Sequence, residues 1–179
     1  MTVKELAVTT RNDCPSSPTA LPEIALARPP AWPPGLPGPA ADACSHRSYL
    51  ELEALAIAVP QARRHIRGTL AQWGLSQIAP DAELITSELV TNAVSASAAS
   101  ASAGLLFRPG VGLLVAAHSD RLIVMVQDAS QEPPVLRPPA DDAMTGRGLG
   151  IVAALSTRWG WVTDAGGKIV WAMVDLGQV

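Results

Sequence analysis

The chain of 179 residues has few of the features that define metal-binding, disulfide-bonded or membrane proteins. Its two cysteines, Cys14 and Cys44, lack the close paired spacing of a zinc site or a CxxC redox motif, so we expect free thiols. Its three histidines include no pair at the i, i+4 spacing of HExxH, which argues against a histidine-based metalloenzyme. No run approaches the roughly 18 consecutive apolar residues of a membrane span.

Positive charge is also scarce. Thirteen Lys and Arg residues stand against sixteen Asp and Glu residues, and the net charge of −3 argues against a basic protein that binds nucleic acid directly. The start, MTVKELAVTTRND, lacks the apolar core of a signal peptide. We therefore expect a cytoplasmic protein with no membrane partner.

Proline divides the chain into two parts. Nine of the sixteen prolines lie between Cys14 and Pro39, in a run that cannot sustain helices or sheet ladders. We predict that residues 1–45 are a disordered, Pro-rich N-terminal tail. Residues 46–179 are then long enough for one domain with a single hydrophobic core.

The apolar patterns of this second part predict a two-layer fold. The expected elements are a strand over 49–59, a helix over 60–73, a helix from 81 into the Ala/Ser-rich stretch 95–104, a hairpin of strands 111–118 and 121–127, a helix over 151–158, and a hairpin of strands 159–163 and 168–176. This order implies an α+β sandwich, with helices on one face of a mostly antiparallel, mixed sheet.

The stretch ELITSELVTNAV, residues 83–94, has a helical period but carries two polar residues at apolar positions. At about 100° per residue, Glu88 and Asn92 project into a sector next to Leu84, whereas Glu83 falls on the opposite, wetter side. Burying an amide and a carboxylate costs several kcal/mol unless a partner pairs with them. Two interpretations remain open, a satisfied buried pair or oxygen ligands for Mg²⁺.

Two further polar sites lie at the ends of expected elements. Asp128 directly follows the apolar strand RLIVMVQ, where it could bind a ligand or simply end the strand. The cluster GRGLG precedes a helix, so its amides could cradle phosphate at the helix N-terminus. It is not the dinucleotide fingerprint, because the spacing is not GxGxxG and no strand leads into it. Lys168, after the turn DAGG, is expected to be a surface lysine.

Taken together and in this order, the motifs resemble a known family. From about Tyr49 to Leu176 the sequence is similar to the histidine-kinase-like ATPase domains, which have the Bergerat-type ATP-binding fold, and to their branch of bacterial anti-sigma-factor serine/threonine kinases. SELVTNAV matches the N box of that branch, Asp128 its adenine-binding aspartate, GRGLGIV its second glycine box, and ALSTRWGW with GGKIVW its closing segment.

The resemblance implies ATP and Mg²⁺ as cofactors and suggests a role for each motif. Asn92 would ligate Mg²⁺, and Glu88 would be the catalytic general base that acts on a partner's serine hydroxyl or on water. Asp128 would accept a hydrogen bond from the adenine amino group. The loop from 130 to 145 would be the ATP lid. The phosphates would be bound by the second glycine box, that is by Gly146, Arg147, Gly148 and Leu149.

The sequence departs from the family at several positions. The family's DxGxG is here DAS, so Ala129 and Ser130 replace a segment whose glycine eases close approach to adenine. Ile169 stands where many relatives have a threonine near the nucleotide, and Ala96 stands where many have a histidine after the N box. Four prolines, at 133, 134, 138 and 139, should stiffen the lid.

Three functional hypotheses follow. The leading one is an anti-sigma-factor-type serine/threonine kinase that phosphorylates a small antagonist protein and, when free of it, sequesters a sigma factor. The alternative is a non-catalytic module in which bound ATP orders the lid and a protein-binding surface. The third is an interaction scaffold that binds no nucleotide. A homodimer is compatible with all three, because no pattern in the chain specifies an oligomeric state.

Overall fold

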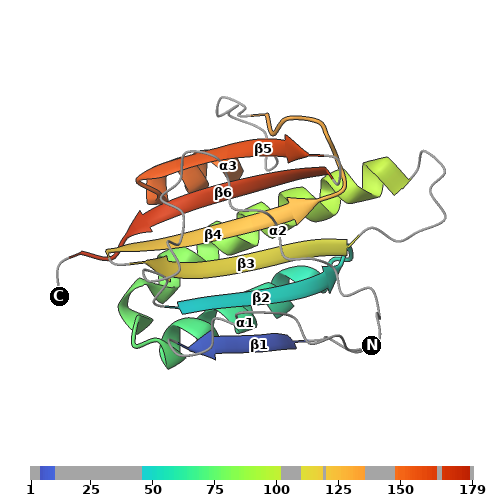
Figure 1. Cartoon of the computed structure of the whole chain (residues 1–179). Coiled ribbons are helices and arrows are strands. Elements are labelled where there is room, and N and C mark those ends of the chain that lie inside the picture. Colours follow the sequence, from blue (N-terminus) through green and yellow to red (C-terminus); the bar gives the residue numbers. More distant parts are fainter. Residues whose placement is uncertain are drawn as a thin grey trace.

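A single antiparallel sheet with helices on one face forms the protein (Figure 1). The computed structural model describes residues 5–10, 46–101, 110–118, 120–135, 148–164 and 167–177. The elements in chain order are β1 (Glu5–Thr10), β2 (His46–Glu53), α1 (Ala58–Gln72), the short 3₁₀ helix η1 (Ser76–Ile78), α2 (Ala79–Ala101), β3 (Gly110–His118), β4 (Arg121–Asp128), α3 (Gly148–Leu155), β5 (Arg158–Asp164) and β6 (Gly167–Asp175).

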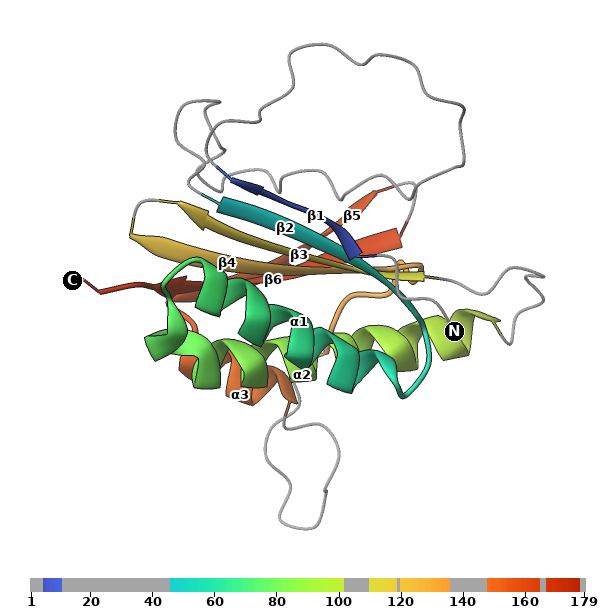
Figure 2. The same ribbon diagram turned by 90° about the horizontal axis from the view of Figure 1, so that it is seen from below.

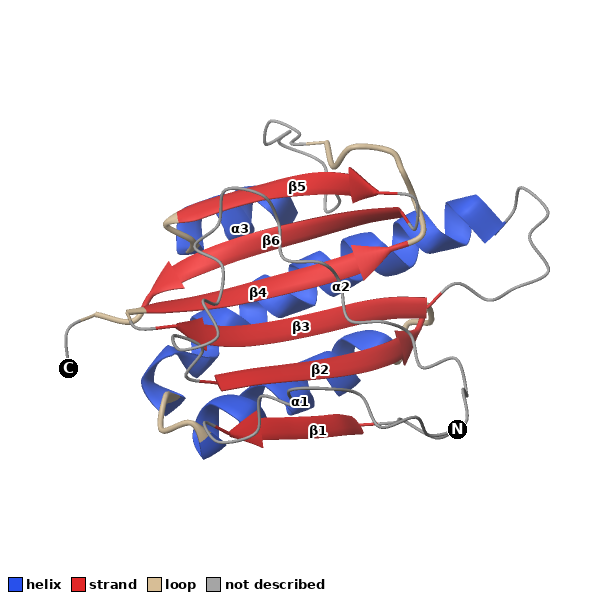
Figure 3. Ribbon diagram, viewed as in Figure 1, coloured by secondary structure: helices blue, strands red, loops and turns tan. Residues whose placement is uncertain are grey.

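The six strands are arranged in the order β1-β2-β3-β4-β6-β5, and every neighbouring pair is antiparallel. Helices α1, α2 and α3 all lie on the same side of this sheet (Figure 2), and the colouring by secondary structure separates the two layers (Figure 3). The predicted α+β sandwich and its two hairpins, β3–β4 and β5–β6, are therefore confirmed. None of the helices described is long and apolar enough to cross a bilayer.

The N-terminal predictions need two corrections. Residues 5–10 form β1, which pairs with β2, so this part of the predicted tail is ordered into the sheet. Its sequence, ELAVTT, contains three β-branched residues and no proline, which suits a strand. Residues 11–45 lie outside the described part of the chain. The strand predicted over 49–59 instead runs from His46 to Glu53, because backbone hydrogen bonds from Leu55 to Glu53 and from Ala58 to Leu55 form a turn before α1.

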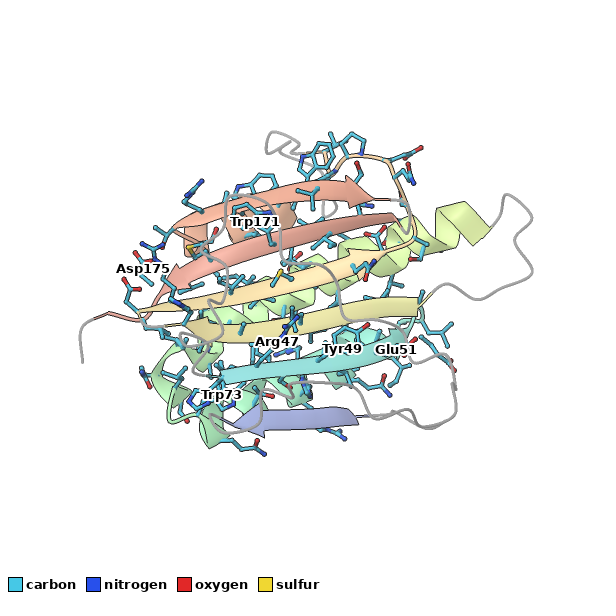
Figure 4. The ribbon with its side chains drawn as sticks, in the orientation of Figure 1. Arg47, Tyr49, Glu51, Trp73, Trp171 and Asp175 are labelled. Carbon is cyan, nitrogen blue, oxygen red and sulfur yellow. The ribbon has the colours of Figure 1, made fainter. Side chains whose placement is uncertain are left out.

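The sheet is apolar on both faces. Along β6, Val170, Ala172 and Val174 belong to the large core beneath the helices. The alternate positions, Ile169, Trp171 and Met173, belong to a second buried cluster. Tyr49 also belongs to this second cluster, and Figure 4 shows it with Trp171 on the face away from the helices.

Helix α2 runs along the middle of the sheet and packs on it through residues such as Ile85 and Leu89, which are 0% and 2% exposed. Leu84, expected beside them, is 43% exposed. Glu83, expected on the wetter side, is buried because α1 packs there and supplies a partner: Arg67 donates hydrogen bonds of 2.6 Å and 2.5 Å to its two carboxylate oxygens. These bonds hold the pKa of Glu83 below its usual value.

Candidate functional site

A cavity of about 380 Å³ lies between α2, α3 and the ends of β4 and β6. Its volume is within the range of small-molecule pockets, about 300–1,000 Å³. Its walls are about half apolar, and the apolar side chains include Leu89, Val126, Leu149 and Val170. The polar side chains that reach it are Asn92, Ser95, Asp128, Ser130, Glu132 and Lys168. A cavity in which polar groups converge among apolar side chains is a common form of ligand site.

Glu88 and Asn92 meet the first residue of α3 at one side of this cavity. A Cβ atom added to Gly148 would lie 2.5 Å from Glu88 Oε2 and 3.6 Å from Asn92 Nδ2. The glycine leaves room for the Glu88 carboxylate in this position, because a Cβ would displace it, whereas the distance to Asn92 is an ordinary contact. Glu88 is half-buried and Asn92 is exposed, so the interpretation as a satisfied buried pair is wrong. Asn92 lines the cavity, and Glu88 lies beside it against Gly148, which also lines the cavity.

Asp128 lies at the other side of the cavity, at the last position of β4. It is 2% exposed, and its Oδ1 accepts hydrogen bonds of 2.8 Å from the backbone N–H of Ser130 and 2.8 Å from Lys168 Nζ. Burial raises the pKa of Asp128, while the hydrogen bonds from Lys168 and Ser130 act in the opposite direction. The carboxylate is thus held in place with Oδ2 left as an acceptor.

Lys168 was expected at the surface, and that prediction is wrong. It is 5% exposed, lines the cavity and forms a buried ion pair with Asp128. The strand register places it directly opposite Asp128, as the first residue after Gly167 in β6. Gly167 has φ +134°, and a Cβ there would clash with the Asp128 carbonyl oxygen, so glycine allows the two strand ends to pass this closely.

The glycine box and the lid are described only in part. Gly148 and Leu149 line the cavity and open α3, so the free amides of its first turn lie at the cavity edge. Gly146 and Arg147 lie outside the described residues, and their predicted roles stay predictions. The lid is described to residue 135, and its first prolines, Pro133 and Pro134, line the cavity.

Of the substitutions noted in the sequence, those at positions 96 and 130 line the cavity and the one at 169 does not. Ile169 belongs to the cluster on the opposite face of the sheet, so its lack of a hydroxyl does not alter the cavity. Its neighbours Lys168 and Val170 face the cavity instead. Ala96 lines the cavity, where its small side chain leaves space. Ser130 also lines it, and its Oγ accepts a 3.1 Å hydrogen bond from the Glu132 N–H that shapes the start of the lid.

The comparison with protein families agrees with this arrangement of an acid and amide on α2, a buried aspartate after β4 and a glycine opening α3. A family model described as a histidine kinase-like ATPase domain matches residues 52–174. The chain belongs to this family. Membership implies an ATP-binding regulatory protein and is consistent with phosphoryl transfer in general. A comparison with curated protein sequences gives no match.

The charges at the site bear on how this ATPase domain could hold a nucleotide with a metal ion. Lys168 is the one cationic side chain among the described residues of the lining, and it is paired with Asp128. The described residues contain no group of three or more His, Cys, Asp or Glu that could hold a metal by themselves. Mg²⁺ commonly uses one or two protein ligands and completes its shell with phosphate oxygens and water. Asn92 lines the cavity next to Gly148, the first residue of α3, and its amide oxygen would fit that role.

Proposed function

We propose that this histidine kinase-like ATPase domain is an anti-sigma-factor-type serine/threonine protein kinase that takes part in partner switching. It transfers a phosphoryl group from ATP to a small antagonist protein and sequesters a sigma factor when the antagonist is absent. The observation that carries this proposal is the meeting of Glu88 and Asn92 at Gly148, on the edge of a cavity whose other side carries Asp128.

Each group has a role in the proposed reaction. Asp128 Oδ2 accepts a hydrogen bond from the adenine amino group, and the first-turn amides of α3 bind the phosphates. Asn92 would hold Mg²⁺, which when bound neutralises charge on the phosphates. Glu88 accepts the proton of the partner's serine hydroxyl as that oxygen forms its bond to the γ-phosphorus. The bond from phosphorus to the bridging oxygen breaks, and ADP leaves.

The decisive experiment is transfer of labelled γ-phosphate from ATP with Mg²⁺ to candidate antagonists, with Glu88→Gln as the test variant. General-base catalysis contributes about 10²- to 10⁴-fold, so transfer should fall by that factor while ATP binding persists. Asp81→Asn is the matched control, because Asp81 is exposed in the first turn of the same helix and lies away from the cavity lining. Transfer to none of the antagonists by the wild-type protein would refute the kinase proposal.

A specific observation supports a second candidate, a non-catalytic module that binds ATP. Ser130 takes the place of a glycine at the cavity, and the buried pair of Asp128 and Lys168 makes this end of the site more rigid. Calorimetry would then show binding of ATP with Mg²⁺, weakened in Asp128→Asn, with neither transfer nor hydrolysis. Measurable turnover would eliminate this candidate.

The partner and the need for nucleotide are tested separately. A pull-down with the full chain should recover a sigma factor or an antagonist protein, and the oligomeric state of the recovered complex would show whether the kinase is a homodimer. A rise in melting temperature with ATP and Mg²⁺ would exclude a scaffold that binds no nucleotide, because a ligand of the native state stabilises it.

A further inference from the structure

The ion pair at the inner end of the cavity has unused hydrogen-bonding capacity. The side chains of Lys168 and Asp128 are 6% and 1% exposed, and their charged atoms are 2.8 Å apart. An ammonium group has three donors and a carboxylate has about four acceptor sites. Among the described residues, Asp128 is the one partner of Lys168, and both hydrogen bonds to Asp128 end on Oδ1. Further N–H groups of Lys168 and the Oδ2 of Asp128 therefore have no hydrogen-bond partner among the described residues.

This leaves a donor and an acceptor side by side on the wall of one cavity, since Lys168 and Asp128 both line it. Burying charged groups is costly unless further hydrogen bonds satisfy them. A ligand with an acceptor atom directly beside a donor could form a hydrogen bond with both side chains at once. A ligand with a lone donor would satisfy only the aspartate.

Adenine has this arrangement of groups. Its exocyclic N6 amino group donates, and the ring nitrogens N1 and N7 on either side of that amino group accept. We infer that Lys168 is a specificity-determining residue, whose ammonium donates to an adenine ring nitrogen while Asp128 accepts from N6. The inference rests on the proposed binding of ATP in this cavity and deepens it, because it makes base recognition depend on two protein groups.

The pair also disfavours 6-oxopurines. In guanine and hypoxanthine the group at C6 is a carbonyl oxygen, and the ring N1 carries a hydrogen. If such a base took the position proposed for adenine, its C6 oxygen would point at the Asp128 carboxylate. In the pose in which N1 rather than N7 faces Lys168, the N1–H would also point at the lysine. The contact with Asp128 becomes repulsive in either pose, and the contact with Lys168 becomes repulsive in the N1-facing pose, so we expect ATP to bind more tightly than GTP or ITP.

The test is a set of affinities measured by calorimetry for ATP, 1-deaza-ATP, 7-deaza-ATP and purine riboside triphosphate, which lacks the amino group. A hydrogen bond to a charged group corresponds to roughly 10- to 100-fold in affinity. Wild-type protein should therefore lose about that factor with one of the two deaza analogues. A loss with 1-deaza-ATP identifies N1 as the acceptor, and a loss with 7-deaza-ATP identifies N7. Equal affinity for ATP and both analogues would overturn the inference without any variant.

Two variants then assign the contacts to residues. Lys168→Met should weaken ATP binding but bind ATP and the sensitive deaza analogue equally, because the donor to the ring nitrogen is gone. Asp128→Asn should lose affinity for ATP and much less for purine riboside triphosphate. If Lys168→Met does not fold, Lys168→Gln keeps an uncharged donor and should retain a reduced preference for ATP over that analogue.

The outcomes separate the two proposals. No binding of ATP by wild-type protein would refute the proposed function. Binding of ATP by the wild type, with the preference for ATP over the sensitive analogue unchanged in Lys168→Met, would leave that function standing and refute the role of Lys168. Melting curves without nucleotide check that each variant is folded.

Discussion

Replacing Gly148 with alanine is a sensitive test of the geometry at Glu88. The added Cβ would lie 2.5 Å from Glu88 Oε2, whereas ordinary contacts begin at 3.4 Å, so the carboxylate must move by about 0.9 Å. The clash involves the end of a flexible side chain, so the fold can accommodate it. Alanine also favours a helix over glycine by up to about 1 kcal/mol. The melting temperature of Gly148→Ala should therefore be unchanged or higher.

The effect on catalysis should be much larger than the effect on stability. A misplacement of about 1 Å in a reacting group can cost about 100-fold in rate. Asn92 Nδ2 would be 3.6 Å from the new atom, which is an ordinary contact, so ATP affinity should change little. Gly148→Ala should thus lower single-turnover transfer at saturating ATP by about two orders of magnitude.

Gly150→Ala is the matched control. Gly150 is exposed on the same helix, and no heavy atom lies within 4 Å of its Cβ position. This variant should melt at the same or a higher temperature and transfer phosphate at the wild-type rate. If Gly148→Ala also transferred phosphate at the wild-type rate, the position of Glu88 would not matter for the reaction, and its assignment as general base would be refuted.

Three further predictions concern stability. Arg67→Met should lower the free energy of unfolding at pH 7, and this loss should shrink as the pH falls through the lowered pKa of Glu83. Equal losses in urea unfolding at pH 7 and pH 3 would contradict this. Burial raises the pKa of Tyr49, the one tyrosine of the sequence, to about 12, so its absorbance should titrate there, and stability should fall by about 2 kcal/mol between pH 10 and 12. A midpoint near 10 would show a solvated phenol. Gly160→Ala would place a Cβ 2.7 Å from the Trp171 ring and should cost about 1–3 kcal/mol in a thermal melt, and an unchanged melting temperature would contradict that packing.

Much of the fold could be predicted because its signals are local. The helix expected over 60–73 is α1, and the glycine that follows it, Gly74, has φ +73°, which suits a helix end. Asp81 lies in the first turn of α2. Both hairpins join strands that are adjacent in sequence. The burial of Glu83 could not be predicted from its own helix, because its position on the wetter side holds only until α1 packs there and contributes Arg67.

The residues of the candidate site could be predicted from the sequence, but the contacts between them could not. Glu88, Asn92 and Asp128 could be found because each is a polar residue placed in or directly after an apolar pattern. That Glu88 and Asn92 face α3 could not be found, since the contact at Gly148 joins helices separated by β3, β4 and the lid. The pairing of β4 with β6 could not be predicted either, because the two strands are not adjacent in sequence and no hairpin turn connects them.

Lys168 was missed because alternation cannot assign a face to a strand that is apolar on both sides. In β6, Val170 and Ala172 face the helices while Ile169 and Trp171 face away, and either set could have been the core. A charged residue at the end of a strand that is buried on both faces has little access to water and needs a counter-charge. Asp128 ends β4, which is also buried on both faces. Opposite charges at the ends of two such strands therefore favour pairing them, which would place a lysine beside Asp128, the aspartate proposed to receive the base.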